Sequence, residues 1–157
     1  MSVAATHIRA VTAFKFILPC EPVLQSAPPL GAGWCHEVKF DGYRLQLHKA
    51  NGKAVVLSKN GKDFTTRFRT IAAAVAAMPC SNCIIDAEGC ALDAEGLPDF
   101  RALVGGQNEK VAWCFDLLEV DGRDMRPFPL VMRRARLKAL IKKAADVRSI
   151  PTASRIR

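Results

Sequence analysis

The sequence predicts an α+β fold in which a mainly antiparallel sheet is flanked by helices. The dipeptide Asn51-Gly52 separates two stretches of strand-like composition, as in a tight β-hairpin. Apolar residues recur at helical spacing over 67–78 and again over 130–143, and residues 110–120 form a strongly apolar run of strand length. Helices that alternate with strands joined by short turns favour a sheet covered by helices.

The size and charge of the chain limit what it can be. It has 157 residues, of which 50% are hydrophobic and 24% charged, as in an ordinary globular domain or part of a larger one. Its formal net charge of +8 predicts affinity for polyanions such as nucleic acid or nucleotide phosphates. The basic residues are scattered, which disfavours a membrane surface as the partner.

The first half of the chain divides into a lead-in and a β-meander. Residues 1–33 are rich in proline and glycine, and we expect an irregular lead-in there. A strand over 34–40 should follow, then a break at Gly42. Strands over 43–49 and 54–57 complete the meander.

The second half alternates helices and strands. The helix over 67–78 stops at Pro79, and a strand over 83–93 is interrupted at Gly89. A short helix over 98–105 is expected next.

The last part of the chain is predicted to contain a strand, a basic helix and a tail. The strand over 110–120 ends at the turn formed by Asp121-Gly122, and the basic helix over 130–143 follows it. Residues 146–157 show no apolar period and are expected to be a frayed tail. The predicted folded domain therefore covers 34–145.

The six cysteines occur without a recognisable secretory leader, and no apolar run reaches the roughly 18 residues of a membrane span. We therefore expect a reducing, cytoplasmic location. Cys80 and Cys83 have zinc or redox spacing, but no second pair of ligands accompanies them. Most of the cysteines are better interpreted as small buried hydrophobic residues.

A lysine inside a predicted strand is the first candidate for chemistry. Alternation along the strand puts Glu37, Lys39 and Asp41 on one face. A surface lysine is the simplest interpretation. A nucleophilic amine is the sharper one, since nearby cations such as Arg44 and Lys59 would lower its pKa while the carboxylates oppose them.

Residues 39–44, KFDGYR, fit the K-x-D-G-x-R signature of the covalent nucleotidyltransferases. The longer pattern, with a proline-rich approach over 19–34 and SKNGKDFTTRF over 58–68, resembles the ligase domain of bacterial ATP-dependent DNA ligases of the non-homologous end-joining type. The resemblance implies a partial, ATP-grasp-like nucleotidyltransferase (adenylation) domain, without the OB-fold domain that follows it in the family.

The resemblance also implies a reaction. Lys39 would attack the α-phosphate of ATP, and the adenylate would pass to the 5′-phosphate of nicked DNA before the DNA 3′-hydroxyl displaces AMP. Glu37 would hold the adenine edge. Asp41 and Gly42 would shape the turn behind the lysine, where glycine permits close approach to the nucleotide, and Arg44 would contact the ribose and the 3′ side of the nick.

Three downstream elements match, two of them with a departure. Lys59 stands where the family has arginine, so that a forked contact becomes a point charge. Glu88 would bind the ribose or the metal, and with Asp86 it would suit Mg²⁺ (or Mn²⁺), but Ala87 replaces the usual glycine and threatens strain of about 1 kcal/mol. Phe115 would stack on adenine. Taken singly, each residue has a simpler explanation. Lys59 would lie in a polar turn, Glu88 would be a solvated strand residue, and Phe115 would be a core aromatic.

The family's later motif, E-G-[VI]-[VIM]-x-K, and the lysines beyond it have no counterpart in the sequence. We therefore expect a truncated chain that forms little or no lysine-AMP, and an exposed sheet edge that promotes association. The implied partners are nicked double-stranded DNA, end-joining proteins and a complementing ligase module. Two alternatives stay open: a non-catalytic basic remnant that binds DNA or a partner, and an RNA ligase or capping-type nucleotidyltransferase.

Overall fold

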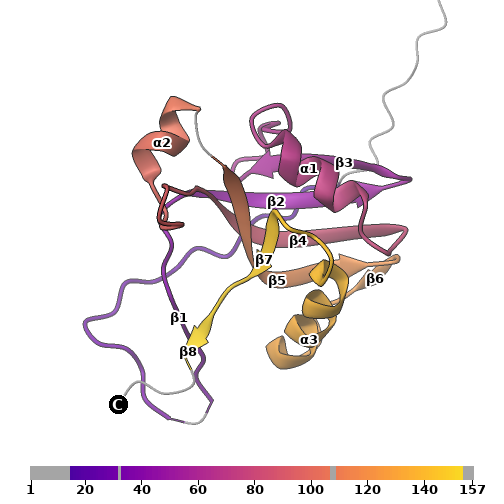
Figure 1. The fold of residues 1–157 in the computed structure, drawn as a ribbon. Helices are drawn as coiled ribbons and strands as arrows, with labels where there is room; N and C mark the ends of the chain where they lie inside the picture. The colour runs from indigo at the N-terminus through magenta and orange to yellow at the C-terminus, as the bar shows by residue number, and fades with distance from the viewer. Residues whose placement is uncertain (1–14, 32, 107–108, 154–157) are drawn as a thin grey trace, which may run out of the picture.

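The computed structural model describes residues 15–31, 33–106 and 109–153. Its main sheet has six strands, in the order β3-β2-β4-β5-β6 with β7 against β5 (Figure 1). The strands are β2 (Tyr43–Ala50), β3 (Lys53–Ser58), β4 (Asn82–Ala91), β5 (Lys110–Val120), β6 (Arg123–Asp124) and β7 (Val147–Ser149). All neighbours are antiparallel except β5 and β7, which are parallel. The predicted α+β fold with a mainly antiparallel sheet is confirmed.

The described part of the chain contains the helices α1 (Arg69–Ala76), α2 (Phe100–Gly105) and α3 (Leu130–Ile141). Each lies inside its predicted range and ends within a few residues of it. Helix α1 buries Ile71 and Val75, because apolar residues three and four positions apart share a face. Asp99 caps α2 by accepting a hydrogen bond of 3.0 Å from the Ala102 backbone N–H. In the part of the chain that the structure describes, none of the helices has the length and apolar character needed to cross a membrane.

The two hairpin turns form as their sequences predict. Asn51 and Gly52, between β2 and β3, have φ values of 51° and 74°. Asp121 and Gly122, between β5 and β6, have φ values of 48° and 78°. Positive φ at both central residues matches the right-handed twist of the paired strands, and it explains the Asn-Gly and Asp-Gly pairs.

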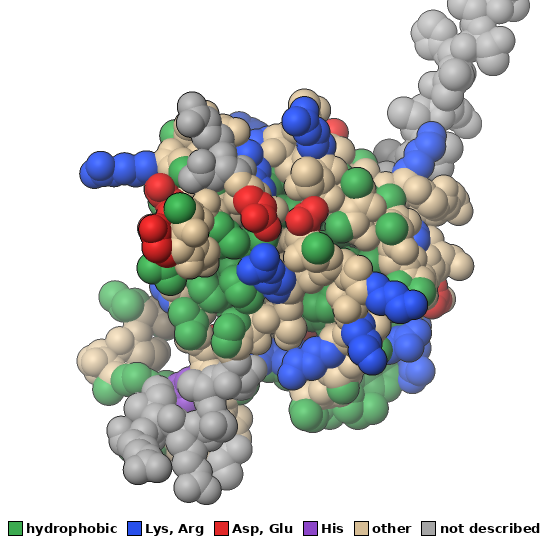
Figure 2. Space-filling model, viewed as in Figure 1, with side chains coloured by type: hydrophobic (Ala, Val, Ile, Leu, Met, Phe, Trp, Pro, Cys, Tyr) green, Lys and Arg blue, Asp and Glu red, His purple; other side chains and the backbone are tan. Residues whose placement is uncertain are grey.

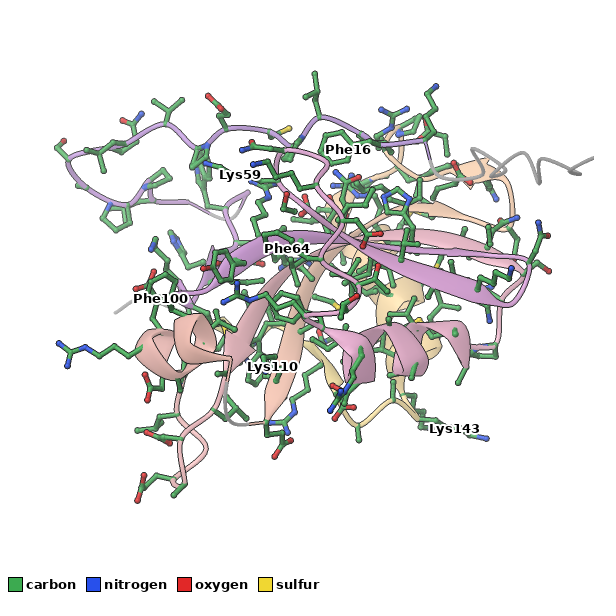
Figure 3. The ribbon with its side chains drawn as sticks, turned by 90° about the horizontal axis from the view of Figure 1, so that it is seen from above. Phe16, Lys59, Phe64, Phe100, Lys110 and Lys143 are labelled. Atoms are coloured by element: carbon green, nitrogen blue, oxygen red, sulfur yellow. The ribbon has the colours of Figure 1, made fainter. Side chains whose placement is uncertain are left out.

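The sheet has an apolar face and a polar face. Leu45, Leu47 and Ile85 are fully buried in the core beneath α1. On the opposite face, the lead-in crosses β2, where the Ile17 backbone N–H donates to Gln46 Oε1 at 3.1 Å. Figure 3 shows the lead-in on one side of the sheet and α1 and α2 on the other. Residues 15–31 and 33 contain no helix or strand, as predicted for the lead-in, whereas 1–14 and 32 lie outside the described residues.

Three predicted details are wrong. The strand expected over 34–40 is only β1 (His36–Glu37), which pairs with β8 (Thr152–Ala153) apart from the main sheet. Its alternation is mostly charged and provides little apolar surface to bury against a core. Strand β4 is not interrupted at Gly89, since its pairing with β5 continues through Gly89 to Ala91.

The predicted tail over 146–157 is the third error. Within it, β7 joins the main sheet, and Val147 and Ile150 are 1% and 8% exposed. A strand of three residues is too short to show a recognisable period, so the sequence pattern does not reveal it. Residues 154–157 lie outside the described part.

The cysteines differ in their exposure. Cys83, Cys90 and Cys114 are buried, as predicted for small hydrophobic residues. Cys80 is partly buried, whereas Cys20 and Cys35 are exposed and are exceptions to a prediction made for most of the six. Among the described residues, no group of three or more His, Cys, Asp or Glu side chains is placed to hold a metal ion.

Candidate active site

Lys39 lies in the irregular segment between β1 and β2, and it is exposed. The half-buried Glu88 of β4 is its electrostatic neighbour. Burial raises the pKa of Glu88, while the Gly42 backbone, Arg44 and Lys39 lower it and Asp41 raises it further. The fold therefore brings the predicted lysine, the motif around it and a carboxylate from a distant strand into one site.

Gly42 holds this segment against β4. A Cβ atom at Gly42 would lie 2.3 Å from the Gly89 carbonyl oxygen, which no real side chain tolerates. The Cys90 thiol also donates to the Asp41 carbonyl at 3.9 Å. The space beside Gly42 is thus filled by the chain's own backbone, and the missing side chain permits close packing of two segments.

Arg44 and Asp86 form a forked ion pair on the polar face. Arg44 Nε lies 3.1 Å from Asp86 Oδ1, and Arg44 Nη2 lies 2.8 Å from Oδ2. Arg44 Nη1 donates to the Cys20 carbonyl of the lead-in at 2.7 Å. The hydrogen bond with Asp86 raises the pKa of Arg44. Because both Asp86 oxygens accept from Arg44, Asp86 in this arrangement orients an arginine, and each oxygen keeps a second lone pair.

Ala87 replaces a glycine of the family pattern without visible strain. Its side chain is fully buried in the core. Among the described residues other than glycine, Asn51 and Asp121 are those with positive φ. Ala87 therefore has an ordinary strand conformation, and the expected displacement of Glu88 by strain has no basis in the backbone.

Aromatic side chains line the site from β5. Phe115 is half-buried, and the Arg44 guanidinium carbon lies 5.5 Å from its ring centroid. Trp113 pairs in register with Glu88 and stacks on Phe40, with centroids 4.5 Å apart and planes 10° apart. The Phe40–Trp113 stack was not predicted. The alternation of Trp113 and Phe115 along the strand is the signal that could have indicated it.

Helix α3 contributes a further arginine that was not predicted as part of the site. Arg134 forms an ion pair with Glu37 and donates to the Phe115 carbonyl at 3.0 Å. The preceding Arg133 forms a forked pair with Asp116, at 2.6 and 2.7 Å. Contacts between a helix and residues so distant in the chain leave no local sequence signal.

Lys59 lies on the exposed turn after β3. Figure 3 shows it on the same side of the sheet as the lead-in, near Phe16. The ring of Phe16 is 3.6 Å from the position of a Cβ atom at Gly61, so the lead-in covers this turn. The structure therefore places Lys59 on the polar face and gives it no fixed contact with Lys39.

The donor set around Lys39 fits a hard divalent cation only in part. Glu88 supplies one carboxylate, and Asp41 is close enough to raise the pKa of that carboxylate. Mg²⁺ is commonly held by one or two carboxylates together with water and substrate phosphates. Glu88 thus fits such an ion beside a bound triphosphate, whereas Asp86 already has Arg44 as its counter-ion.

The fold and this site define a nucleotidyltransferase-like domain built around a motif lysine. The family model of the ATP dependent DNA ligase domain matches residues 20–157, which is most of the chain. The chain belongs to this family.

Two relatives illustrate the match. The multifunctional non-homologous end joining protein LigD of Pseudomonas aeruginosa is 38% identical over 133 residues, which cover 82% of this chain. A probable DNA ligase of Streptomyces coelicolor is 34% identical over 139 residues, covering 80% of this chain. The chain spans only 16% and 27% of the lengths of these two proteins.

Solved structures agree with the fold. The mycobacterial DNA ligase D complexed with ATP and MES has a TM-score of 0.62 at 26% identity, covering 75% of this chain and 39% of that one. The ligase domain of Mycobacterium tuberculosis LigD also has a TM-score of 0.62, at 28% identity, covering 74% of this chain and 40% of that one.

Proposed function

We propose that this chain is the nucleotide-binding part of an ATP-dependent DNA ligase that acts in DNA repair or end joining, and that Lys39 is the residue that takes up AMP. The observation that carries the proposal is the placement of Lys39 beside Glu88, with Arg44 and Phe115 on the adjoining strands. A similar ligase D has been solved in complex with ATP, which supports ATP as the nucleotide.

In the proposed step, the Lys39 amine attacks the α-phosphorus of ATP. A nitrogen–phosphorus bond forms, the bond to the bridging oxygen breaks, and pyrophosphate leaves with the electron pair. The amine must give up its proton to attack. Glu88, an electrostatic neighbour of Lys39 whose pKa is raised by burial, is a carboxylate that can accept this proton while no cation is bound to it.

A bound Mg²⁺ would neutralise charge on the phosphates. Among the described residues Glu88 is the protein ligand that fits it. Phe115 would support the face of the base, and Arg44, already fixed by Asp86 and the Cys20 carbonyl, would direct its remaining N–H groups toward the sugar. The DNA 5′-phosphate would then accept AMP from Lys39.

Incubation with ATP labelled at the α-phosphate tests the proposal. We expect ATP binding and a faint covalent label, since the chain corresponds to less than half of each similar ligase structure. The label should disappear in Lys39→Ala and persist in Lys53→Ala, which removes an exposed lysine at the start of β3. Undiminished label in Lys39→Ala would refute the assignment of Lys39. Labelling by GTP in preference to ATP would favour the capping-type alternative.

A second candidate function, DNA binding without chemistry, is favoured by the charge of the chain. Figure 2 shows Lys and Arg side chains gathered over the region of α3, where Arg136 and Lys138 are exposed. Phosphate contacts of this kind weaken steeply with salt. If this is the whole function, nicked DNA should bind equally well to the unaltered chain and to Lys39→Ala, and ATP should bind to neither.

A further inference from the structure

Arg134 joins its own helix, α3, to two other segments of the site, β5 and the segment around β1. Its Nε donates to the Phe115 carbonyl of β5 at 3.0 Å, and its Nη1 lies 3.2 Å from the sulfur of Cys35. Its Nη2 forms the ion pair with Glu37 of β1. One guanidinium on α3 thus engages the segment that leads to Lys39 and the strand that carries the aromatic ring.

The use of all three nitrogens separates Arg134 from an ordinary surface arginine. Its side chain is only 15% exposed, whereas Arg136, two residues further along the same helix, is exposed. Several donors in a fixed fork are a property of arginine that lysine lacks. Holding this side chain in one geometry costs conformational entropy, which three simultaneous contacts offset.

We propose that Arg134 is a positioning residue that sets the preference for adenine, an inference that rests on the proposed function. In that function the base lies against Phe115, and the resemblance to the family puts Glu37 at the edge of the base. Arg134 contacts both of these residues, so their spacing is fixed before a nucleotide arrives. The ion pair engages Oε1 of Glu37, and in this proposal Oε2 is the acceptor for the base.

The chemistry of the two purines turns this arrangement into selectivity. Adenine carries an amino group at its six position, which donates a hydrogen bond, whereas guanine carries a carbonyl oxygen there, which accepts one. A carboxylate oxygen held at that edge attracts the donor and repels the acceptor. Without Arg134, Glu37 can rotate away from the base, and the discrimination is lost.

Equilibrium binding of ATP and GTP to the full chain tests the inference, with intrinsic fluorescence as the signal because Trp113 pairs with Glu88. Arg134→Ala should weaken ATP binding about tenfold, the loss of one charge-assisted contact, and change GTP binding little. Arg134→Lys, which keeps the charge without the fork, should lie between. Arg136→Ala is the matched control and should match the unaltered chain.

A second variant covers the case in which Arg134→Ala does not fold. Glu37→Gln leaves the contact of Arg134 with the Phe115 carbonyl in place and should also reduce the ATP to GTP affinity ratio. Equal losses for both nucleotides, or an unchanged ratio, in the variants that fold would overturn the inference while leaving the proposed function intact. Failure of the unaltered chain to bind ATP would contradict the proposed function, and the inference would fall with it.

Discussion

Gly42 lies directly against Gly89, so closely that a Cβ atom at Gly42 would come within 2.3 Å of the Gly89 carbonyl oxygen. The obstacle is the backbone of β4, which cannot swing aside as a flexible side chain can. This contact fixes how the segment carrying Lys39 leaves the sheet. The glycine of the motif therefore has a packing role in the chain itself.

Gly42→Ala should destabilise the fold and displace Lys39 from Glu88. Forcing an extra carbon into this contact should lower the free energy of unfolding by about 2 kcal/mol or more. Urea unfolding followed by circular dichroism measures the change. Gly33→Ala is the control, because nothing lies within 4 Å of a Cβ atom at that position. Equal stability of the two variants would contradict the packing role.

Ala87→Gly, which restores the residue usual in the family, should weaken the chain. Ala87 is fully buried in a strand, so glycine removes a packed methyl group and adds freedom to the unfolded chain. A loss of about 1–2 kcal/mol in the free energy of unfolding is expected. A gain in stability would show that alanine is strained at this position after all.

Asp86→Ala should cost about 2 kcal/mol of stability, because it leaves the guanidinium of Arg44 partly buried without its counter-ion. The side chain of Asp86 is 6% exposed and that of Arg44 is 26% exposed. The pair of Asp124 and Arg126 is well exposed, and Asp124→Ala serves as the comparison with no measurable change expected. Similar effects of the two substitutions on the denaturant midpoint would argue against a special role for the pair beneath the site.

His48 should make the fold sensitive to mild acid. Burial lowers its pKa from 6.5 to about 4, so the unfolded chain takes up a proton before the folded chain does. This contribution to stability is complete above pH 6.5 and is lost as the pH falls toward 4, by about 3 kcal/mol in all.

The matched variant is His48→Gln, whose amide can donate to Gln46 Oε1 as the imidazole Nε2 is placed to do, at 3.2 Å. Denaturant unfolding at several pH values between 7 and 4 should show a smaller loss of stability in the variant than in the unaltered chain. Parallel pH profiles for the two proteins would contradict this role of His48.

Elements with a strong local pattern could be predicted from the sequence. Strand β5 covers 110–120 as expected, because an uninterrupted apolar run ends at an Asp-Gly turn. Helix α3 begins at Leu130 as expected, because apolar residues recur at helical spacing from this position. In contrast, β7 has three residues and depends on its partner β5, so its formation is decided by tertiary contact.

Some residues of the site could likewise be predicted from the sequence, and others could not. The motif around Lys39 and the carboxylate Glu88 could be proposed from sequence, and the structure brings them together. The pairing of Asp86 with Arg44, and the reach of Arg134 from α3 to Glu37, could not. Such contacts depend on how strands align and how a helix docks, which no local spacing encodes.

The most direct test of the account uses an adenosine that carries a sulfonyl fluoride group in place of its phosphates, 5′-fluorosulfonylbenzoyl adenosine. A lysine amine beside the bound nucleoside attacks the sulfur, a sulfur–nitrogen bond forms, and fluoride and a proton leave. Mass spectrometry of peptides from the full chain should locate the label on Lys39, with strong protection by ATP. Equal labelling of exposed lysines such as Lys53 and Lys143, unaffected by ATP, would contradict the placement of Lys39 at a nucleotide site.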